Sequence, residues 1–285
     1  MRLWEGFAEG LRELGYIEGK NIVIERRYYE GGVDALDALA VELVRLGVDV
    51  IVAGASPAPE VAKRVTSTVP IVMATHVDPL TSGLVASLAK PGGNVTGTSL
   101  AATELRGKQL QLLKETLPKL SRVAILLDPT SSTYRDDLRE VEGAARSLQM
   151  PIAIVEARAP NEFADAFSAA VKARVGALLI IGGTALIYSN RRRIAELAIE
   201  RRLPTMTGLR DFAEVGCLMA YGPNLLDGFR RAAWYVDRIL KGAKPGDLPV
   251  EQATTFALTI NLKTAKALGL SIPLSVTARA DATIE

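Results

Sequence analysis

Residues 69–100 read VPIVMATHVDPLTSGLVASLAKPGGNVTGTSL. The stretch has two short runs rich in β-branched residues, at 69–75 and 94–100, and between them a segment at 80–89 with apolar residues at helical spacing. Two strands joined through a helix form a parallel pair with a right-handed crossover. The stretch therefore predicts one unit of a parallel α/β sheet, with polar residues where its first strand ends.

The same alternation of strands and helices continues in both directions along the chain. Predicted strands lie at 21–29, 48–54, 69–75, 94–100, 122–128, 151–157, 175–183, 203–207 and 217–222. Predicted helices lie at 4–14, 34–46, 57–67, 80–89, 133–148, 161–173, 187–201, 209–214 and 225–241. Because the strands fall into two series and not into eight evenly spaced units, we expect two similar α/β lobes and not a closed barrel.

Composition and charge exclude several classes of protein. The 285 residues are 48% hydrophobic and 23% charged, with a net charge of +2 and no dense basic run, so we expect a globular protein that does not bind nucleic acid. The sequence contains no run of 18 apolar residues, so we expect no membrane span. Residues 1–16 lack the pattern of a signal peptide. One cysteine, Cys217, and one histidine, His76, exclude an intrachain disulfide and a Cys-rich or multi-His metal site. We expect no metal and no cofactor.

His76 is the one residue that suggests catalysis, because Thr75 and Asp78 lie beside it. It could act as a general base oriented by the Asp78 carboxylate. In the simpler interpretation, Asp78 caps a helix that begins with Pro79, and His76 only lines a loop. The motifs of nucleotide-binding loops, serine hydrolases and zinc proteases are absent. We therefore predict no catalytic residue and no enzyme activity.

Small and polar residues follow most of the predicted strands. They occur at 54–57, 75–78, 128–132, 182–184 and 207–208. In open parallel sheets, ligands bind outside the carboxyl ends of the strands. The sequence therefore predicts a small-molecule site built from these loops, in which the hydroxyls and helix N-termini suit a carboxylate. For each of these loops, ordinary helix capping or a plain turn is the competing interpretation.

Several stretches resemble the ABC transporter substrate-binding protein family, in its branch with tryptophan- and tyrosine-type members. The most specific are DPLTSGLVASLAKPGGNVTG (78–97), GCLMAYGPN (216–224) and DRILKGAKPGDLPVEQ (237–252), and the resemblance covers essentially the whole chain. It implies a type I periplasmic-binding-protein fold, an α/β fold of two Rossmann-like lobes with parallel sheets joined by three crossovers. Lobe 1 would comprise 1–97 and 223–248, and lobe 2 would comprise 98–222 and 249–285.

The resemblance also implies a first strand and loop before the helix of WEGFAEGLRELGY (4–16), and this sequence starts almost at that helix. We therefore expect the first strand of lobe 1 to be missing. A sheet without it has an open edge, through which a partner chain or a second copy could pair. A homodimer through this edge is one arrangement that would close it, and a truncated sequence is the other explanation of the missing strand.

The function implied by the resemblance is that of the solute-binding component of an ABC importer, outside the cytoplasm. A small molecule, either an amino acid or an aromatic carboxylate, would be held in the interlobe cleft by hinge closure and delivered to the transmembrane permease subunits. Asp78 or Asp211 would pair an ammonium group. The candidate ligand-binding residues are Ser56, Thr75, Asp78, Asp128, Thr130, Ser132, Tyr134, Gly183, Asp211 and Tyr221. The alternatives are a ligand-sensing regulator lobe of the same fold and an α/β enzyme that uses His76.

Overall fold

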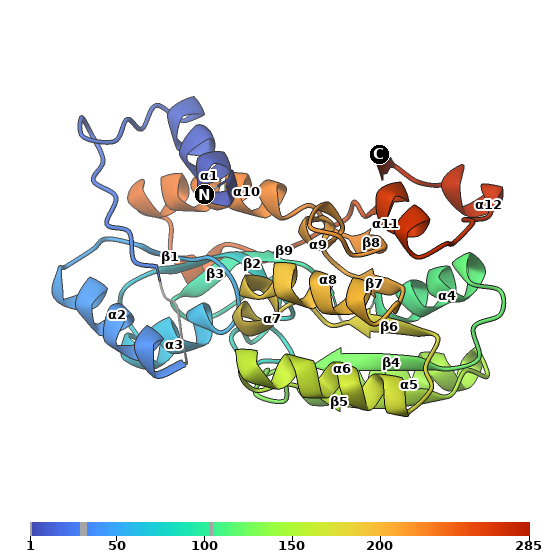
Figure 1. The fold of residues 1–285 in the computed structure, drawn as a ribbon. Helices are drawn as coiled ribbons and strands as arrows, with labels where there is room; N and C mark the ends of the chain where they lie inside the picture. Colours follow the sequence, from blue (N-terminus) through green and yellow to red (C-terminus); the bar gives the residue numbers. More distant parts are fainter. Residues whose placement is uncertain (1, 29–32, 103–104) are drawn as a thin grey trace. The chain divides into compact units, whose positions relative to one another are not determined.

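The computed structural model describes residues 2–28, 33–102 and 105–285. The chain divides into two compact units, one made of 1–101 with 225–253 and the other of 102–224 with 254–285. Each unit has its own sheet with helices packed on it (Figure 1). None of the helices in the described part of the chain has the length and hydropathy to cross a membrane.

Unit 1 contains a four-stranded parallel sheet in the order β1-β2-β3-β9. Its strands are β1 (Ile51–Ala53), β2 (Ile71–His76), β3 (Val95–Ser99) and β9 (Glu251–Gln252). Its helices are α1 (Arg2–Glu13), α2 (Val33–Arg45), α3 (Ala58–Val65) and α10 (Leu225–Leu240), with a 3₁₀ turn at Pro245–Asp247. In Figure 1, α1 and α10 lie on one face of this sheet and α2 and α3 on the other.

The central strand β2 shows why the sheet is covered on both faces. Val72 and Ala74 pack among Phe7 of α1 and Phe229 of α10. The alternate residues Ile71 and Met73 pack into a second core cluster that includes Ala62 of α3. A strand buried on both faces reads as a continuous apolar run and not as an alternating one, and IVMATH fits that description.

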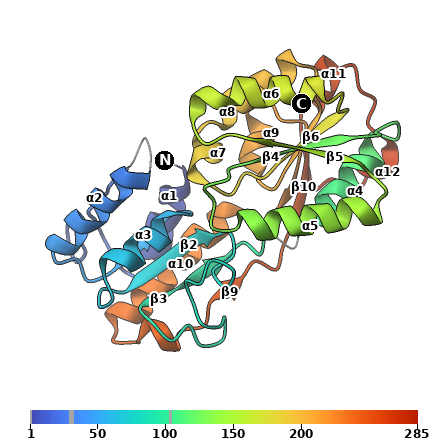
Figure 2. The same ribbon diagram turned by 90° about the horizontal axis from the view of Figure 1, so that it is seen from below.

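Unit 2 contains a seven-stranded sheet in the order β11-β10-β8-β7-β6-β4-β5, parallel except where β10 pairs antiparallel with β8. Its strands are β4 (Val123–Leu127), β5 (Ile152–Glu156), β6 (Ala177–Ile180), β7 (Thr205–Thr207), β8 (Met219–Gly222), β10 (Ala257–Asn261) and β11 (Ala282–Ile284). Its helices are α4 (Arg106–Thr116), α5 (Tyr134–Ser147), α6 (Phe163–Lys172), α7 (Ala185–Ser189), α8 (Arg191–Glu200), α9 (Arg210–Glu214), α11 (Leu262–Ala267) and α12 (Leu274–Thr277), with a 3₁₀ turn at Pro160–Glu162. In Figure 2, α5 and the pair α6 and α8 lie on opposite faces of β4, β5 and β6.

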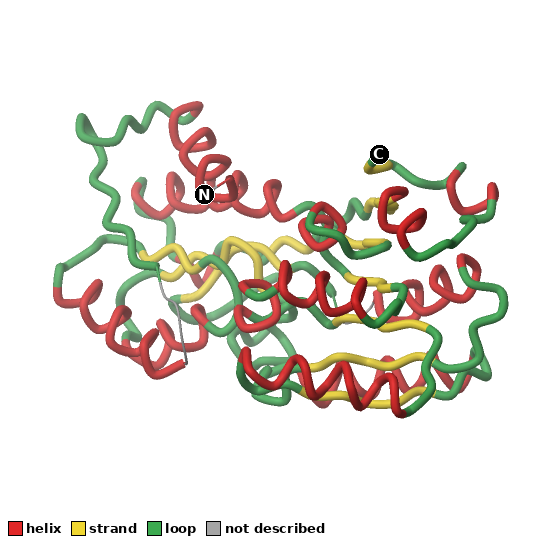
Figure 3. The backbone as a smooth tube through the Cα atoms, viewed as in Figure 1, coloured by secondary structure: helices red, strands yellow, loops and turns green. Residues whose placement is uncertain are grey.

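The strand predicted at 21–29 is wrong. Residues 23–28 belong to no sheet, and an isolated bridge between Glu18 and Ile22 lies just before them. Figure 3 draws this part of the chain, after α1, as a loop; residue 29 lies outside the described residues. The segment has the composition of a strand, but among the described residues β1 pairs only with β2, and no strand of that part of the chain pairs with residues 23–28. A strand requires a partner as well as β propensity.

The helix predicted at 80–89 is also wrong, because residues 79–90 form successive turns and bends. The Asp78 carboxylate accepts hydrogen bonds from the backbone N–H groups of Leu80 and Thr81, both at 3.1 Å, which closes a turn. Gly83 then takes a left-handed backbone conformation, with φ of 71°, and this ends any helical run. Asp78 therefore caps a turn and not a helix. The single helix predicted at 187–201 is divided into α7 and α8 at Asn190.

Candidate functional site

The first candidate loops lie at the carboxyl ends of β1 and β2 in unit 1. Ser56 follows β1 and is 95% buried, and its Oγ has no hydrogen-bond partner among the described residues. The Thr75 hydroxyl lies inside the sheet, where it donates to the backbone oxygen of Gly54 over 2.5 Å. Of these two hydroxyls, that of Ser56 is the one with unused hydrogen-bonding capacity.

His76 ends β2 in a fully buried position. Its Nε2 lies 2.9 Å from Oε1 of Glu60 on α3, and its Nδ1 has no partner among the residues that the structure describes. The Asp78 carboxylate instead bonds Leu80 and Thr81, so the pair suggested by the sequence, His76 with Asp78, is not the one shown. Glu60 lies 16 residues before His76, and no local spacing in the sequence pointed to it.

The loop after β4 in unit 2 places Asp128 and Thr130 together. The buried Asp128 carboxylate accepts from the Thr130 backbone N–H at 2.9 Å and from its hydroxyl at 2.6 Å. Ser132 is exposed on the same loop. Tyr134 points its hydroxyl toward the end of β5, where it donates to Glu156 over 2.5 Å, and this hydrogen bond raises the pKa of Tyr134. Tyr134 therefore does not join Asp128 and Thr130.

The loops after β6 and β7 meet through Tyr188 of α7 and Asp211 of α9. The Tyr188 hydroxyl donates to Asp211 Oδ1 over 3.0 Å, and the Arg191 guanidinium lies 4.5 Å from the centre of the Tyr188 ring. Burial, and next the charge of Asp211, raise the pKa of Tyr188 above its ordinary range, so the hydroxyl keeps its proton at neutral pH. Gly183 lies half-buried in the loop before α7. The ring, the guanidinium and the carboxylate form one polar and aromatic cluster.

A buried polar network lies beneath these loops and was missed from the sequence. Arg106 of α4 donates to Asp137 of α5 over 2.8 Å, and the Thr133 hydroxyl donates to the other oxygen of Asp137 over 2.8 Å. Gln109 accepts from Arg106 at 3.2 Å and donates to the backbone oxygen of Tyr221 at 2.9 Å. The network thus connects the loop after β4 with β8, and it holds the backbone of Tyr221 in place.

One sequence signal could have found this network. Arg106 and Gln109 are three residues apart and lie on the same face of α4 as the buried Leu110 and Leu113. A polar pair on the apolar face of a helix indicates a buried hydrogen-bonded cluster. Its partner Asp137 lies on another helix, so only the tertiary structure identifies it.

Taken one by one, the candidate residues have the chemistry that binding of a polar small molecule requires. Carboxylates such as Asp211 pair with an ammonium group, hydroxyls such as that of Ser56 bond a carboxylate, and Tyr188 offers an aromatic surface. In the described ranges 2–28, 33–102 and 105–285, no group of three His, Cys, Asp or Glu side chains could hold a metal ion.

Comparison with known proteins identifies the family of the chain. The family model for ABC transporter substrate binding protein matches residues 1–284. A tyrosine-binding protein of Clostridioides difficile (strain R20291) is 26% identical over 266 residues, which cover 93% of this chain and 76% of that protein.

Two solved structures match almost the whole chain. A conserved domain protein from Vibrio cholerae has a TM-score of 0.92 at 26% identity and covers 99% of this chain and 94% of that one. An ABC domain from Streptococcus pneumonia in complex with L-Trp has a TM-score of 0.90 at 27% identity. The match covers 99% of this chain and 95% of that one. The two α/β units also match more distant solute-binding proteins in fold. The chain therefore belongs to the ABC transporter substrate-binding protein family and has the type I periplasmic-binding-protein fold.

Proposed function

We propose that this chain is the solute-binding component of an ABC importer and that its solute is an amino acid with an aromatic side chain. The observation that carries the proposal is the match, over 99% of this chain, to a structure that contains L-Trp. The tyrosine-binding relative supports the same class of ligand. The role is non-enzymatic, outside the cytoplasm, with transmembrane permease subunits as partners.

The chemistry of an amino acid assigns roles to the candidate residues. Asp211 pairs the ammonium group, because its carboxylate is half-exposed and held by Tyr188. Ser56 donates to the carboxylate, because its buried hydroxyl has no partner among the described residues. Tyr188 and Tyr221 supply aromatic surface for the ligand side chain.

The test is a thermal-shift screen of the purified protein against the twenty amino acids, followed by calorimetry. L-Trp or L-Tyr is expected to raise Tm by several degrees. Two matched analogues separate the proposed contacts. Tryptophanamide lacks the carboxylate, and indole-3-propionate lacks the ammonium group, so each should bind at least about tenfold more weakly than L-Trp. No shift with any amino acid, together with no small molecule retained in native mass spectrometry, would contradict the proposal.

An enzyme that uses His76 is the competing function, and its test is turnover. L-Trp or L-Tyr incubated with the protein should be recovered unchanged by mass spectrometry. His76→Asn and Glu60→Gln should leave that result and the affinity unchanged, even where they lower Tm. Conversion of the amino acid by the unaltered protein, lost in both variants, would favour catalysis.

A further inference from the structure

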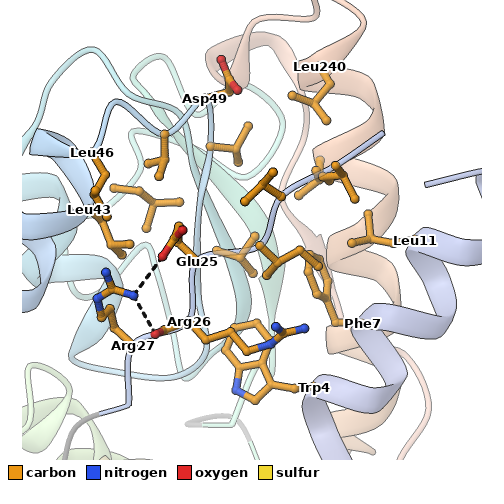
Figure 4. Close-up of a pocket in the computed structure, with 18 of the residues that line it drawn as sticks. Trp4, Phe7, Leu11, Glu25, Arg26, Arg27, Leu43, Leu46, Asp49 and Leu240 are labelled. Atoms are coloured by element: carbon orange, nitrogen blue, oxygen red, sulfur yellow. Dashed lines mark hydrogen bonds and ion pairs between the residues drawn. The ribbon is translucent and has the colours of Figure 1, made fainter. Parts of the chain in front are cut away.

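Two hollows of similar size differ in how their charged side chains are paired. The hollow in unit 1, of about 380 Å³, has largely apolar walls, and its Arg27 is bonded to Glu25 over 3.2 Å (Figure 4). The hollow in unit 2, of about 390 Å³ and here called the basic hollow, is lined by Ser121, Arg122, Pro151, Lys172, Ala173 and Arg174. Three of these side chains are cations and none is a carboxylate. We propose that the basic hollow binds the phosphate group of an organic phosphate.

The basic hollow lies at the amino ends of β4, β5 and β6. Val123 of β4 is in register with Ile152 of β5 and with Ala177 of β6. The segments that precede these strands therefore lie side by side, with Arg122 immediately before β4 and residues 172–176 before β6. The candidate loops for the amino acid follow the carboxyl ends of the strands, which form the opposite edge of a parallel sheet. The basic hollow is thus separate from those loops.

Hydrogen bonds hold the three segments of this hollow together. The Val123 backbone N–H donates to the Pro151 oxygen over 3.1 Å, and the Gly176 backbone N–H donates to the Arg122 oxygen over 2.9 Å. The Arg122 side chain adds a third link, since its Nη1 donates to the Ala173 oxygen over 3.1 Å. Because the walls are fixed before a ligand arrives, little ordering free energy is spent on binding.

The Arg122 guanidinium keeps one edge unused. Its Nη1 is bonded to Ala173, whereas its Nε is buried and has no hydrogen-bond partner among the described residues. A buried N–H without a partner costs free energy, and a bound anion removes this cost. Nε and Nη2 lie on the same edge of the guanidinium, which matches two oxygens of a phosphate. Because Nε is buried, uptake of the phosphate includes a small rotation of the side chain that brings this edge to the hollow.

Lys172 and Arg174 supply the remaining positive charge. Both are exposed, and neither forms an ion pair with a carboxylate in the part of the chain that the structure describes. Three neighbouring cations repel one another, and a phosphate dianion relieves more of that repulsion than a single carboxylate does. The Ser121 hydroxyl adds a neutral donor. The volume falls within the range of about 300–1,000 Å³ for small-molecule sites, so an organic group attached to the phosphate also has room.

A competing interpretation assigns these cations to helix stability. α6 ends at Lys172, and cations near a helix C-terminus stabilise the helix through its dipole. Arg174 separates the two interpretations, because its backbone is left-handed, with φ of 54°. Glycine adopts this conformation without the steric cost that a side chain brings. Arg174→Gly should therefore keep or raise Tm while it removes one cation from the hollow.

The test measures binding of glycerol 3-phosphate to the full chain by calorimetry and thermal shift. The expected result is 1:1 binding that raises Tm and weakens as salt is added. Cosedimentation with vesicles distinguishes the two sources of such a phosphate. Binding to vesicles of phosphatidylcholine and phosphatidylglycerol, in addition to glycerol 3-phosphate, would support a phospholipid headgroup. Binding of glycerol 3-phosphate without vesicle binding would support a soluble phosphate.

Variants locate the phosphate. Arg122→Gln and Arg174→Gly should each weaken binding of glycerol 3-phosphate at least about tenfold. Lys266→Gln removes an exposed cation of α11, outside the hollow, and is the matched control that should bind normally. All three variants should bind L-Trp as the unaltered chain does. The result for glycerol 3-phosphate does not depend on L-Trp binding, so this proposal and the proposed function fail separately.

Four results would overturn the proposal. The first is the absence of glycerol 3-phosphate binding, even where vesicles bind. The second is equal weakening by Lys266→Gln and Arg174→Gly, which would mean general attraction between charges. The third is a lower Tm of Arg174→Gly with unchanged phosphate binding, which would assign the cations to helix stability. The fourth is competition between L-Trp and glycerol 3-phosphate, which would mean that they share one site.

Discussion

Arg106 donates from Nε to Asp137 Oδ1 over 2.8 Å in the interior of unit 2, and each side chain is only 2% exposed. The consecutive helices α4 and α5 are thereby joined beneath the loop that carries Asp128. Loss of one partner from a buried pair leaves an uncompensated charge, which costs about 3–5 kcal/mol.

We predict that Asp137→Ala lowers the free energy of unfolding by about 3 kcal/mol, measured by urea denaturation. The double variant Arg106→Met/Asp137→Leu should lose less free energy of unfolding than a variant that removes only one of the two charges, because no unpaired charge remains. Arg139→Ala is the control, since it breaks an exposed pair with Asp136 and should cost under about 1 kcal/mol. Equal losses in Asp137→Ala and Arg139→Ala would show that burial does not determine the cost.

The second prediction concerns the ammonium group of the proposed ligand. Asp211→Asn removes the negative charge and keeps the shape, so calorimetry should show at least about tenfold weaker L-Trp binding. Glu214→Gln, on the same helix and paired with Arg210 at 3.0 Å, is the matched control and should bind normally. Indole-3-propionate lacks the ammonium group, so Asp211→Asn should not weaken its binding; an equal loss for both ligands would contradict the assigned role.

The third prediction is that substitution by alanine changes stability in opposite directions at two helical glycines. Gly143→Ala in α5 should raise stability by up to about 1 kcal/mol, because alanine favours the helix and its Cβ meets nothing closer than Arg146 at 4.0 Å. At Gly228 in α10, a Cβ would collide with the Ala74 backbone oxygen and lie 2.9 Å from Thr75 Cγ2. Gly228→Ala should therefore lower stability by about 2 kcal/mol. Thermal denaturation checks both, and stabilisation by Gly228→Ala would show that α10 can move off the sheet.

The fourth prediction concerns Cys217, which is fully buried. Burial raises the pKa of its thiol from 9.0 to about 12. The folded state thus keeps the proton that the unfolded state releases, so this contribution to stability is complete below about pH 9 and is lost as the pH rises toward 12.

Iodoacetamide at pH 8 should therefore label Cys217 only in urea-unfolded protein, as measured by intact mass. Cys217→Ser should lessen the loss of stability between pH 9 and pH 11 relative to the unaltered chain. Rapid labelling of the native protein would mean that the segment between α9 and β8, which carries Cys217, opens readily.

Several features could be predicted from the sequence because their causes are local. The apolar run at 69–75 and the polar residues after it indicated a buried strand with a loop at its carboxyl end, and β2 confirms the strand. The strand–helix alternation through 122–222 appears in unit 2 as an α/β sheet, since hydrophobic periodicity acts over a few residues. The family resemblance was confirmed by the match to residues 1–284.

Other features depend on contacts between distant residues. Only the tertiary structure pairs His76 with Glu60, Tyr188 with Asp211 and Gln109 with the backbone of Tyr221. Residues 23–28 have the composition of a strand and yet form none, because β pairing requires a neighbour that the local sequence does not supply. The sequence by itself thus determined which segments can form strands and helices and where polar loops follow them. The tertiary structure decided the partners of His76 and of the Tyr188 hydroxyl, because Glu60 and Asp211 lie outside the local stretch of sequence around each of them.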